Sequence, residues 1–135
     1  MIPPVRKRAR ILVMDDEESI LEVTCEILEV FGYEVESSRE GEEALSKYRR
    51  ALLDGKRFDL VIMDLTVPMG MGGQDAVREL LKIDPLAQAI VSSGHATDPI
   101  VSNYLAHGFV GTIPKPYRME ELDIIVKKAL ASPTT

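Results

Sequence analysis

Two short apolar runs constrain the fold of this chain more than any other feature of its sequence. Residues 11–14 read Ile-Leu-Val-Met, and residues 58–63 are apolar at every position except Asp59. A strand with one face in solvent alternates polar and apolar residues, so these runs predict strands that are buried on both faces. Strands of that kind occur mainly in parallel sheets with helices on either side.

Strand and helix patterns alternate five times along the chain. Three further strands are predicted at 33–37, 87–92 and 109–113, and a helical pattern follows each of the five strands. The fourth helical pattern is marked by Ile100, Val101, Tyr104 and Leu105 and is expected to end at Gly108.

This alternation predicts an α/β fold with right-handed βαβ crossovers and a parallel sheet covered on both faces. Five units of this length fit a flavodoxin-like, doubly wound (βα)5 architecture, a fold class whose five-stranded parallel sheet has the order 2-1-3-4-5. We expect one domain over residues 10–131, with an N-terminal lead-in at 1–9 and a C-terminal tail at 132–135.

The charge balance and the single cysteine exclude several classes of function. The chain has 16 basic and 22 acidic residues and a net charge of −6, which argues against broad nucleic-acid binding because such binding needs a basic surface. Cys25 is the sole cysteine, so an internal disulfide and a thiolate metal cluster are excluded. A run of ~20 apolar residues and a signal peptide are both missing, so we expect a soluble, cytoplasmic protein without membrane contact.

Polar residues stand at the ends of the predicted strands. In order along the chain they are Asp15 and Asp16, then Asp64, then Ser92 and Ser93, then Lys115. In doubly wound sheets, ligands bind outside the carboxyl ends of the strands, where the strand order reverses. We therefore expect three carboxylates, a hydroxyl and an ammonium to converge at one edge of the sheet.

Three carboxylates held together repel one another and raise each other's pKa unless a cation neutralises them. An all-oxygen set of ligands favours Mg²⁺ over zinc. A carboxylate is also a competent nucleophile for phosphoryl transfer, a reaction that otherwise needs positive charge on the phosphoryl oxygens. This chemistry predicts Asp64 as the nucleophile, with Mg²⁺, the Lys115 ammonium and the Ser93 hydroxyl on the three oxygens.

Four segments together resemble the receiver domain of two-component response regulators. They are "ILVMDDE" at 11–17, "DLVIMDLTVPMGMGG" at 59–73, "AIVSSGH" at 89–95 and "GTIPKPY" at 111–117. Each segment alone is a weak signal, whereas all four in this order, over nearly the whole chain, are specific. The sequences of the second and third segments are similar to those in receivers of hybrid sensor histidine kinases. The chain is therefore either such a module or a stand-alone receiver.

The resemblance implies a role for each residue of the expected metal site. Asp64 matches the phosphoacceptor and a metal ligand, Asp16 matches the direct Mg²⁺ ligand, and Asp15 matches the residue that acts largely through metal-bound water. Thr66 would supply its backbone carbonyl to the metal.

The resemblance also implies which residues contact the phosphoryl group. Lys115 matches the lysine of the family and precedes Pro116 by a bond that is usually cis. Ser93, rather than Ser92, matches the hydroxyl that moves to the phosphoryl group. Thr112 departs from the family pattern, since an aromatic residue usually stands there, and this puts the usual coupling to the output surface in question.

The expected partner is a histidine kinase or a phosphotransfer protein that donates the phosphoryl group, while the target remains open. Receivers also pair through the fourth helix, fifth strand and fifth helix, which leaves a homodimer open. The protein is expected to be a signalling module rather than an enzyme, beyond phosphorylating and dephosphorylating itself at Asp64. His95 either overhangs the site or is an exposed loop residue.

Two alternatives remain. The first is an aspartate-nucleophile phosphatase of the haloacid-dehalogenase type, although that family has D-x-D-x-T after its first strand, whereas the segment here is Asp64-Leu65-Thr66 after the third. The second is a degenerate receiver that serves only for docking. Multiple-turnover hydrolysis of a phosphate monoester would favour the first.

Overall fold

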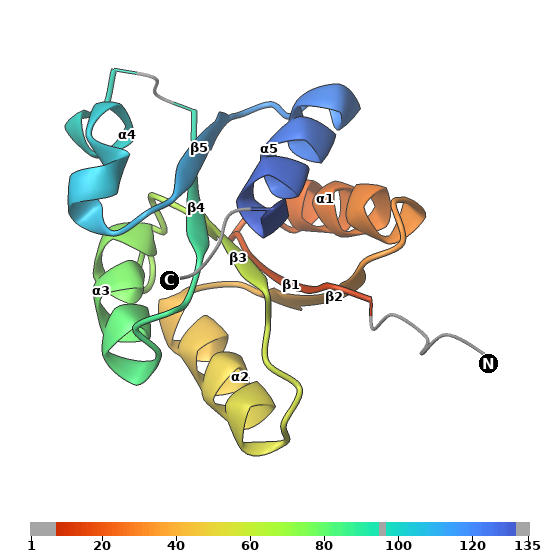
Figure 1. Cartoon of the computed structure of the whole chain (residues 1–135). Coiled ribbons are helices and arrows are strands. Elements are labelled where there is room, and N and C mark those ends of the chain that lie inside the picture. Colours follow the sequence, from red (N-terminus) through yellow and green to blue (C-terminus); the bar gives the residue numbers. More distant parts are fainter. Residues whose placement is uncertain (1–7, 95–96, 132–135) are drawn as a thin grey trace.

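A computed structural model describes residues 8–94 and 97–131 (Figure 1). Most of the expected lead-in, His95 and the expected tail at 132–135 lie outside the described residues.

Strands and helices alternate along the described chain. The strands are β1 (Arg10–Met14), β2 (Glu34–Ser38), β3 (Leu60–Asp64), β4 (Ala89–Ser93) and β5 (Gly111–Pro114). The helices are α1 (Glu18–Val30), α2 (Gly41–Leu53), α3 (Gly73–Ile83), α4 (Pro99–Ser102), the 3₁₀ helix η1 (Tyr104–His107) and α5 (Met119–Ala131). Among the helices of residues 8–94 and 97–131, none is long and apolar enough to cross a membrane.

All five strands are parallel and lie in the order β2-β1-β3-β4-β5, which confirms the predicted fold class and strand order. The central strands β1 and β3 are in register up to the pair Met14 and Met63. Their carboxyl ends are therefore level, and the residues that follow them lie next to one another.

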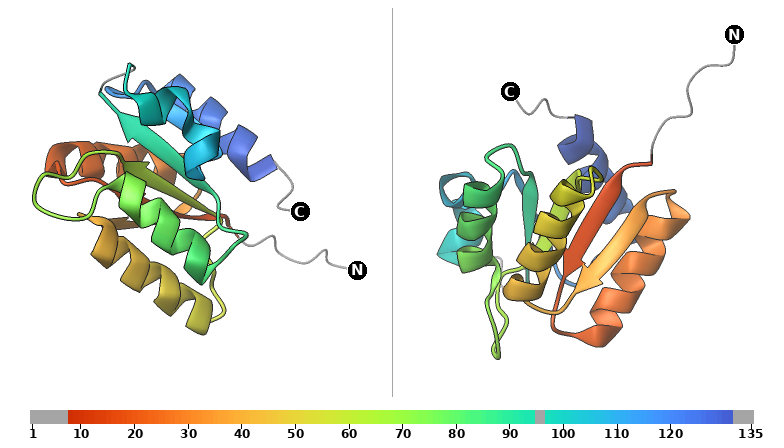
Figure 2. Two further views of the ribbon diagram at one scale, coloured as in Figure 1. Left: turned by 90° about the vertical axis from the view of Figure 1, so that its left-hand side faces the viewer. Right: turned by 90° about the horizontal axis from the view of Figure 1, so that it is seen from below.

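Helices cover both faces of the sheet, as Figures 1 and 2 show. Alternate residues of β1 enter two separate cores. Ile11 and Val13 pack with residues of α1 and α5, whereas Leu12 and Met14 pack with residues of α2 and α3. All four side chains are at most 2% exposed, which confirms that the unbroken apolar run is buried on both faces.

The predicted starts of three strands were wrong by two residues. Phe58, Ala87 and Phe109 are buried, but each comes two residues before its strand begins. Phe58 instead packs under the guanidinium of Arg10, at 4.5 Å from its ring centre. An apolar run in the sequence indicates which residues are buried, and the buried residues extend beyond those that pair in the sheet.

The fourth helix differs most from its prediction. It ends after four residues because Asn103 leaves the helical region, with φ −126° and ψ 43°, and η1 then continues as a 3₁₀ turn. Gly108 ends that turn with φ 100°, as expected for a residue in the left-handed region. Leu105, one of the residues that marked the predicted helix, lies in η1 and is 71% exposed.

Candidate functional site

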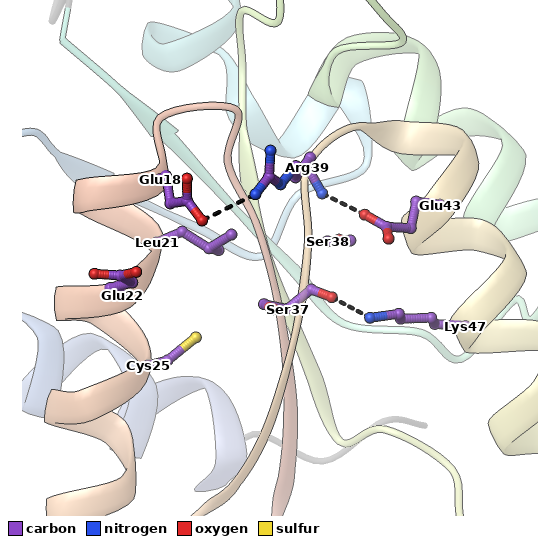
Figure 3. Close-up of a pocket in the computed structure, with 9 residues that line it drawn as sticks. All are labelled: Glu18, Leu21, Glu22, Cys25, Ser37, Ser38, Arg39, Glu43 and Lys47. Atoms are coloured by element: carbon purple, nitrogen blue, oxygen red, sulfur yellow. Dashed lines mark hydrogen bonds and ion pairs between the residues drawn. The ribbon is translucent and has the colours of Figure 1, made fainter.

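A first hollow lies between α1 and α2, beside the end of β2, and two of its cationic side chains are bonded locally (Figure 3). Arg39 forms an ion pair of 2.9 Å with Glu18, and Lys47 donates to the carbonyl of Ser37. Burial raises the pKa of the Cys25 thiol to about 11, so this group is protonated and unreactive near neutral pH. The thiol and the locally bonded charges of this hollow therefore do not indicate a catalytic site.

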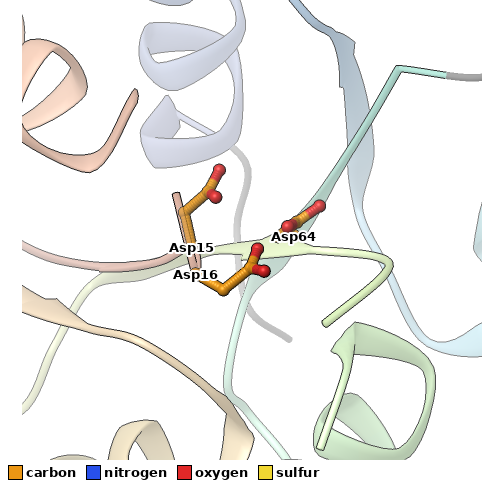
Figure 4. Close-up of side chains that lie close together, drawn as sticks. All are labelled: Asp15, Asp16 and Asp64. Carbon is orange, nitrogen blue, oxygen red and sulfur yellow. The ribbon is translucent and has the colours of Figure 1, made fainter. Parts of the chain in front are cut away.

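The carboxyl edge of the central strands is different, because acidic groups there lie close together. One carboxylate oxygen each of Asp15, Asp16 and Asp64 falls within 4.8 Å of the others (Figure 4). Asp15 and Asp16 come from the end of β1, and Asp64 is the last residue of β3. Asp15 and Asp64 are 1% and 5% exposed, whereas Asp16 is exposed. These oxygens fit a hard divalent cation such as Mg²⁺.

Lys115 reaches this cluster from the loop after β5. Its Nζ lies 2.7 Å from Oδ2 of Asp15 and 3.2 Å from Oδ1 of Asp64. The contact with Asp15 is a short ion pair between two largely buried side chains. Burial lowers the pKa of the Lys115 ammonium, but the two carboxylates outweigh it and hold that pKa above its usual value. The lysine is therefore charged and placed to neutralise part of the cluster.

The Asp64 carboxyl has a strongly perturbed acidity. Burial and, next, the negative charge of Asp15 raise its pKa from 3.8 to about 7, although Lys115 lowers it in part. A strongly shifted pKa of this kind is typical of functional sites, where ionisable groups are buried and held close to like charges. A cation added to the cluster would favour the ionised form of Asp64.

A cavity of about 260 Å³ opens beside these groups. The residues that line it are Asp16, Glu17, Asp64, Thr66, Pro68, Ser93, Gly94 and Lys115. It thus brings together five of the six predicted site residues, and the sixth, Asp15, contacts the same Lys115 ammonium from within the protein. Glu17, Pro68 and Gly94 were not predicted from the sequence.

The two serines at the end of β4 have separate environments. Ser93 lines the cavity, whereas Ser92 is fully buried and its hydroxyl is hydrogen-bonded to that of Tyr117. Tyr117 was not singled out from the sequence, since only the tertiary structure brings it to Ser92. The Lys115–Pro116 bond is cis, as the resemblance implied.

Two glycines hold the loop after β3 close to the strand that ends in Asp64. A Cβ at Gly72 would lie 2.5 Å from the carbonyl oxygen of Leu65, and one at Gly73 would lie 2.9 Å from that of Asp64. Gly73 N–H also donates to the Leu65 carbonyl at 3.2 Å. Only glycine allows this close approach, so the loop beside Asp64 is packed rather than loose.

Comparison with known proteins gives a consistent result. A family model described as the response regulator receiver domain matches residues 11–127. A response regulator receiver protein of Anaeromyxobacter sp. (strain Fw109-5) is 36% identical over 107 residues, which make up 79% of this chain and 42% of that protein. The chemotaxis protein CheY of Thermotoga maritima is 34% identical over 110 residues, which make up 81% of this chain and 87% of CheY.

Solved structures agree with the sequence relatives. The receiver domain protein (CheY-like) from Methanospirillum hungatei JF-1 superimposes with a TM-score of 0.80 at 31% identity, covering 92% of this chain and 94% of that one. The chain thus spans less than half of the first relative and most of CheY, as expected for a module that occurs both alone and within longer proteins. Because the family model covers most of its length and its sheet matches that of a solved receiver, this chain belongs to the response regulator receiver domain family.

Proposed function

We propose that this chain is the phosphoacceptor of a two-component phosphorelay, with Asp64 as the residue that takes the phosphoryl group. The single observation that carries this proposal is the position of Asp64. Its carboxylate ends a buried strand, faces an open cavity, and has the Lys115 ammonium at 3.2 Å and two further carboxylates beside it.

The proposed step forms one bond and breaks one bond. An oxygen of the Asp64 carboxylate attacks the phosphorus in line, while the bond from phosphorus to the nitrogen of a donor histidine breaks and the imidazole keeps the electron pair. The product is an acyl phosphate on Asp64. The donor would be a histidine kinase or a phosphotransfer protein, as the family membership suggests.

The chain's own groups would stabilise the transferred phosphoryl oxygens. Lys115 needs to move only from its contacts with Asp15 and Asp64 to an oxygen on the new phosphoryl group, and Ser93 lines the same cavity as a hydroxyl donor. Charged donors aimed at developing negative charge are the main source of rate in phosphoryl transfer.

A divalent cation fits the acidic cluster. Asp15 supplies a buried carboxylate oxygen whose partner among the described residues is its ion pair with Lys115, and such an oxygen is suited to a cation. The proposed holders of Mg²⁺ are Asp15, Asp16, Asp64 and the backbone carbonyl of Thr66. When bound, the cation would neutralise the carboxylates and supply positive charge to a phosphoryl oxygen.

Signalling would follow from a shift between two conformations, favoured by new hydrogen bonds from the phosphoryl group to Ser93 and Lys115. Thr112 is half-buried on β5, next to Val91 of β4, where the family usually has an aromatic residue. We expect the output to depend less on an aromatic side chain than in other receivers. A homodimer through α4, β5 and α5, and a cytoplasmic location, remain predictions.

The test is labelling by a small phosphodonor. Acetyl phosphate with Mg²⁺ is expected to phosphorylate the protein, as seen by phosphate-affinity electrophoresis, and the label should vanish in Asp64→Ala and in EDTA. Asp54→Ala is the matched control, because Asp54 is an exposed residue at the end of α2, where its carboxylate contacts only Arg50 among the ion pairs found in residues 8–94 and 97–131.

Several outcomes would decide between the alternatives. Labelling that persists in Asp64→Ala or in EDTA would contradict the proposal. Sustained release of phosphate from a monoester would favour the phosphatase instead. A folded protein that takes no label from acetyl phosphate or a kinase would favour the docking receiver.

A further inference from the structure

The loop that carries Lys115 has a side-chain tether that the proposed chemistry does not use. The hydroxyl of Tyr117, two residues after Lys115, is hydrogen-bonded to the hydroxyl of Ser92 at 2.5 Å, and either group can donate. Ser92 is fully buried and Tyr117 packs against the core shared by α1 and α5. The hydrogen bond therefore joins a fully buried residue of β4 to a partly buried residue of the loop after β5.

Ser92 is joined directly to the strand that carries Asp64. The two residues are register partners in β3 and β4, and the N–H of Leu65 donates to the carbonyl of Ser92 at 2.9 Å. The Ser92 hydroxyl thus points from the residue beside the phosphoacceptor toward the loop after β5.

A second contact joins the loop after β5 to β4, the strand that carries Ser92. The backbone N–H of Lys115 donates to the carbonyl of Ser93 at 3.0 Å. The backbone bond fixes the start of the loop, and the Tyr117 hydroxyl fixes it two residues further on. The loop is therefore attached to β4 at Lys115 itself and again at Tyr117, and the Lys115 ammonium reaches Asp64 from this doubly attached segment.

From these contacts we infer that Ser92 and Tyr117 act as a pair of positioning residues, which set where the Lys115 ammonium lies relative to the phosphoacceptor. The inference rests on the proposed function, since it concerns how that site is assembled. Neither residue touches the phosphoryl group, so both act only through Lys115.

The state of the phenol supports this role. Burial raises the pKa of Tyr117 to about 12, so the group keeps its proton across the pH range of a phosphorylation assay. A phenol that stays protonated can keep this hydrogen bond throughout that range, as expected of a fixed support rather than a pH-dependent switch.

The first variant to test is Tyr117→Phe, which keeps the ring and removes only the hydroxyl. We expect phosphorylation by acetyl phosphate to slow by about three- to tenfold, the range that corresponds to losing one neutral hydrogen bond. The affinity for beryllofluoride at saturating Mg²⁺ should fall by a similar factor. The Mg²⁺ affinity should not fall, because the tether does not involve the acidic residues and a displaced Lys115 ammonium would repel the cation less.

A comparison in the Lys115→Ala background separates positioning from general loss of structure. If the pair acts through Lys115, adding Tyr117→Phe to Lys115→Ala leaves the residual rate unchanged. Likewise, Ser92→Ala combined with Tyr117→Phe should cost no more than the single changes. An equal slowing in both backgrounds, or a matching loss of Mg²⁺ affinity, would overturn the inference.

Tyr48→Phe is the matched control. Tyr48 is another buried phenol, 1% exposed, whose hydroxyl donates to Asp84 at 2.7 Å, and Asp84 comes before β4, at the opposite end of the sheet. This change should lower the melting temperature without slowing phosphorylation. If Tyr117→Phe behaves in the same way, the tether has only a structural role and the inference is wrong.

These outcomes also separate the inference from the proposed function. A wild-type protein that takes no phosphoryl group would refute the function itself. A wild-type protein that is labelled at the same rate as Tyr117→Phe would refute only the positioning role. Should Ser92→Ala fail to fold, Tyr117→Phe alone decides the matter.

Discussion

Replacing Asp64 with asparagine is expected to stabilise the metal-free protein above pH 7, although it destroys the proposed site. Folding raises the pKa of this carboxyl from 3.8 to about 7, first because it is buried and second because Asp15 is negative, while Lys115 only partly compensates. Asparagine has nearly the same shape and no charge, so it avoids the cost of holding a buried anion beside another.

The size of the gain follows from the change in pKa. A pKa raised by about three pH units corresponds to about 4 kcal/mol, at about 1.4 kcal/mol per unit, and this is an upper limit because the value belongs to interacting carboxyls. We expect a gain of about 2–4 kcal/mol at pH 8.

The direction of the pH dependence follows from which state binds the proton more tightly. The folded protein does, so the favourable contribution of Asp64 is complete below about pH 4 and is lost as the pH rises to about 7. Asparagine does not titrate. The difference between the two proteins should therefore be near zero at pH 4 and largest at pH 8.

Urea denaturation in EDTA, from pH 4.5 to pH 8, measures this difference. Asp54→Asn serves as the control, because that carboxylate is largely exposed and should change the unfolding free energy little at any pH. Added Mg²⁺ should reduce the advantage of Asp64→Asn by stabilising the wild type. A variant that is less stable than the wild type at pH 8, or a gain that does not vary with pH, would refute the reasoning.

Three further predictions test the metal site, the loop and the distant network. Asp16→Ala should weaken Mg²⁺ binding about tenfold or more in a calorimetric titration, and an unchanged affinity would exclude Asp16 as a ligand. Gly72→Ala should cost about 1–3 kcal/mol in urea denaturation, because its Cβ would meet the carbonyl oxygen of Leu65 at 2.5 Å, and an unchanged midpoint would contradict that contact. Tyr48→Phe should cost about 1–3 kcal/mol, since it removes a hydrogen bond to the Asp84 carboxylate, and a stability equal to wild type would show the bond to be unimportant.

Much of the fold was predictable because burial on both faces leaves a direct trace in the sequence. The run from Ile11 to Met14 has no polar residue because each face of β1 packs against a different pair of helices. The position of Asp64 was predictable for a related reason, since a charged residue at the end of such a run marks the carboxyl edge of the sheet, where it lines the cavity. The strand order itself came from the fold class.

Other features depend on contacts between distant segments and could not be predicted. The hydrogen bond between Ser92 and Tyr117 exists because β4 and the loop after β5 meet in space, and neither residue alone signals it. The break in the fourth helix depends on the backbone angles of Asn103, whereas Leu105 had a helical spacing that agreed with an unbroken helix. The spacing of apolar residues predicts which side of a helix is buried only where the helix continues without a break.

The contact of Lys115 with two carboxylates has a consequence for the sequence of binding events. When ionised, Asp15, Asp16 and Asp64 carry three negative charges against the one positive charge of Lys115, which leaves an excess equal to the charge of one divalent ion. Under the proposed function the phosphodonor is itself an anion, so it would be repelled by the metal-free pocket and admitted once that excess is neutralised. We therefore expect the cation to bind first and the phosphodonor second, and a monovalent ion to remove only half of the excess charge.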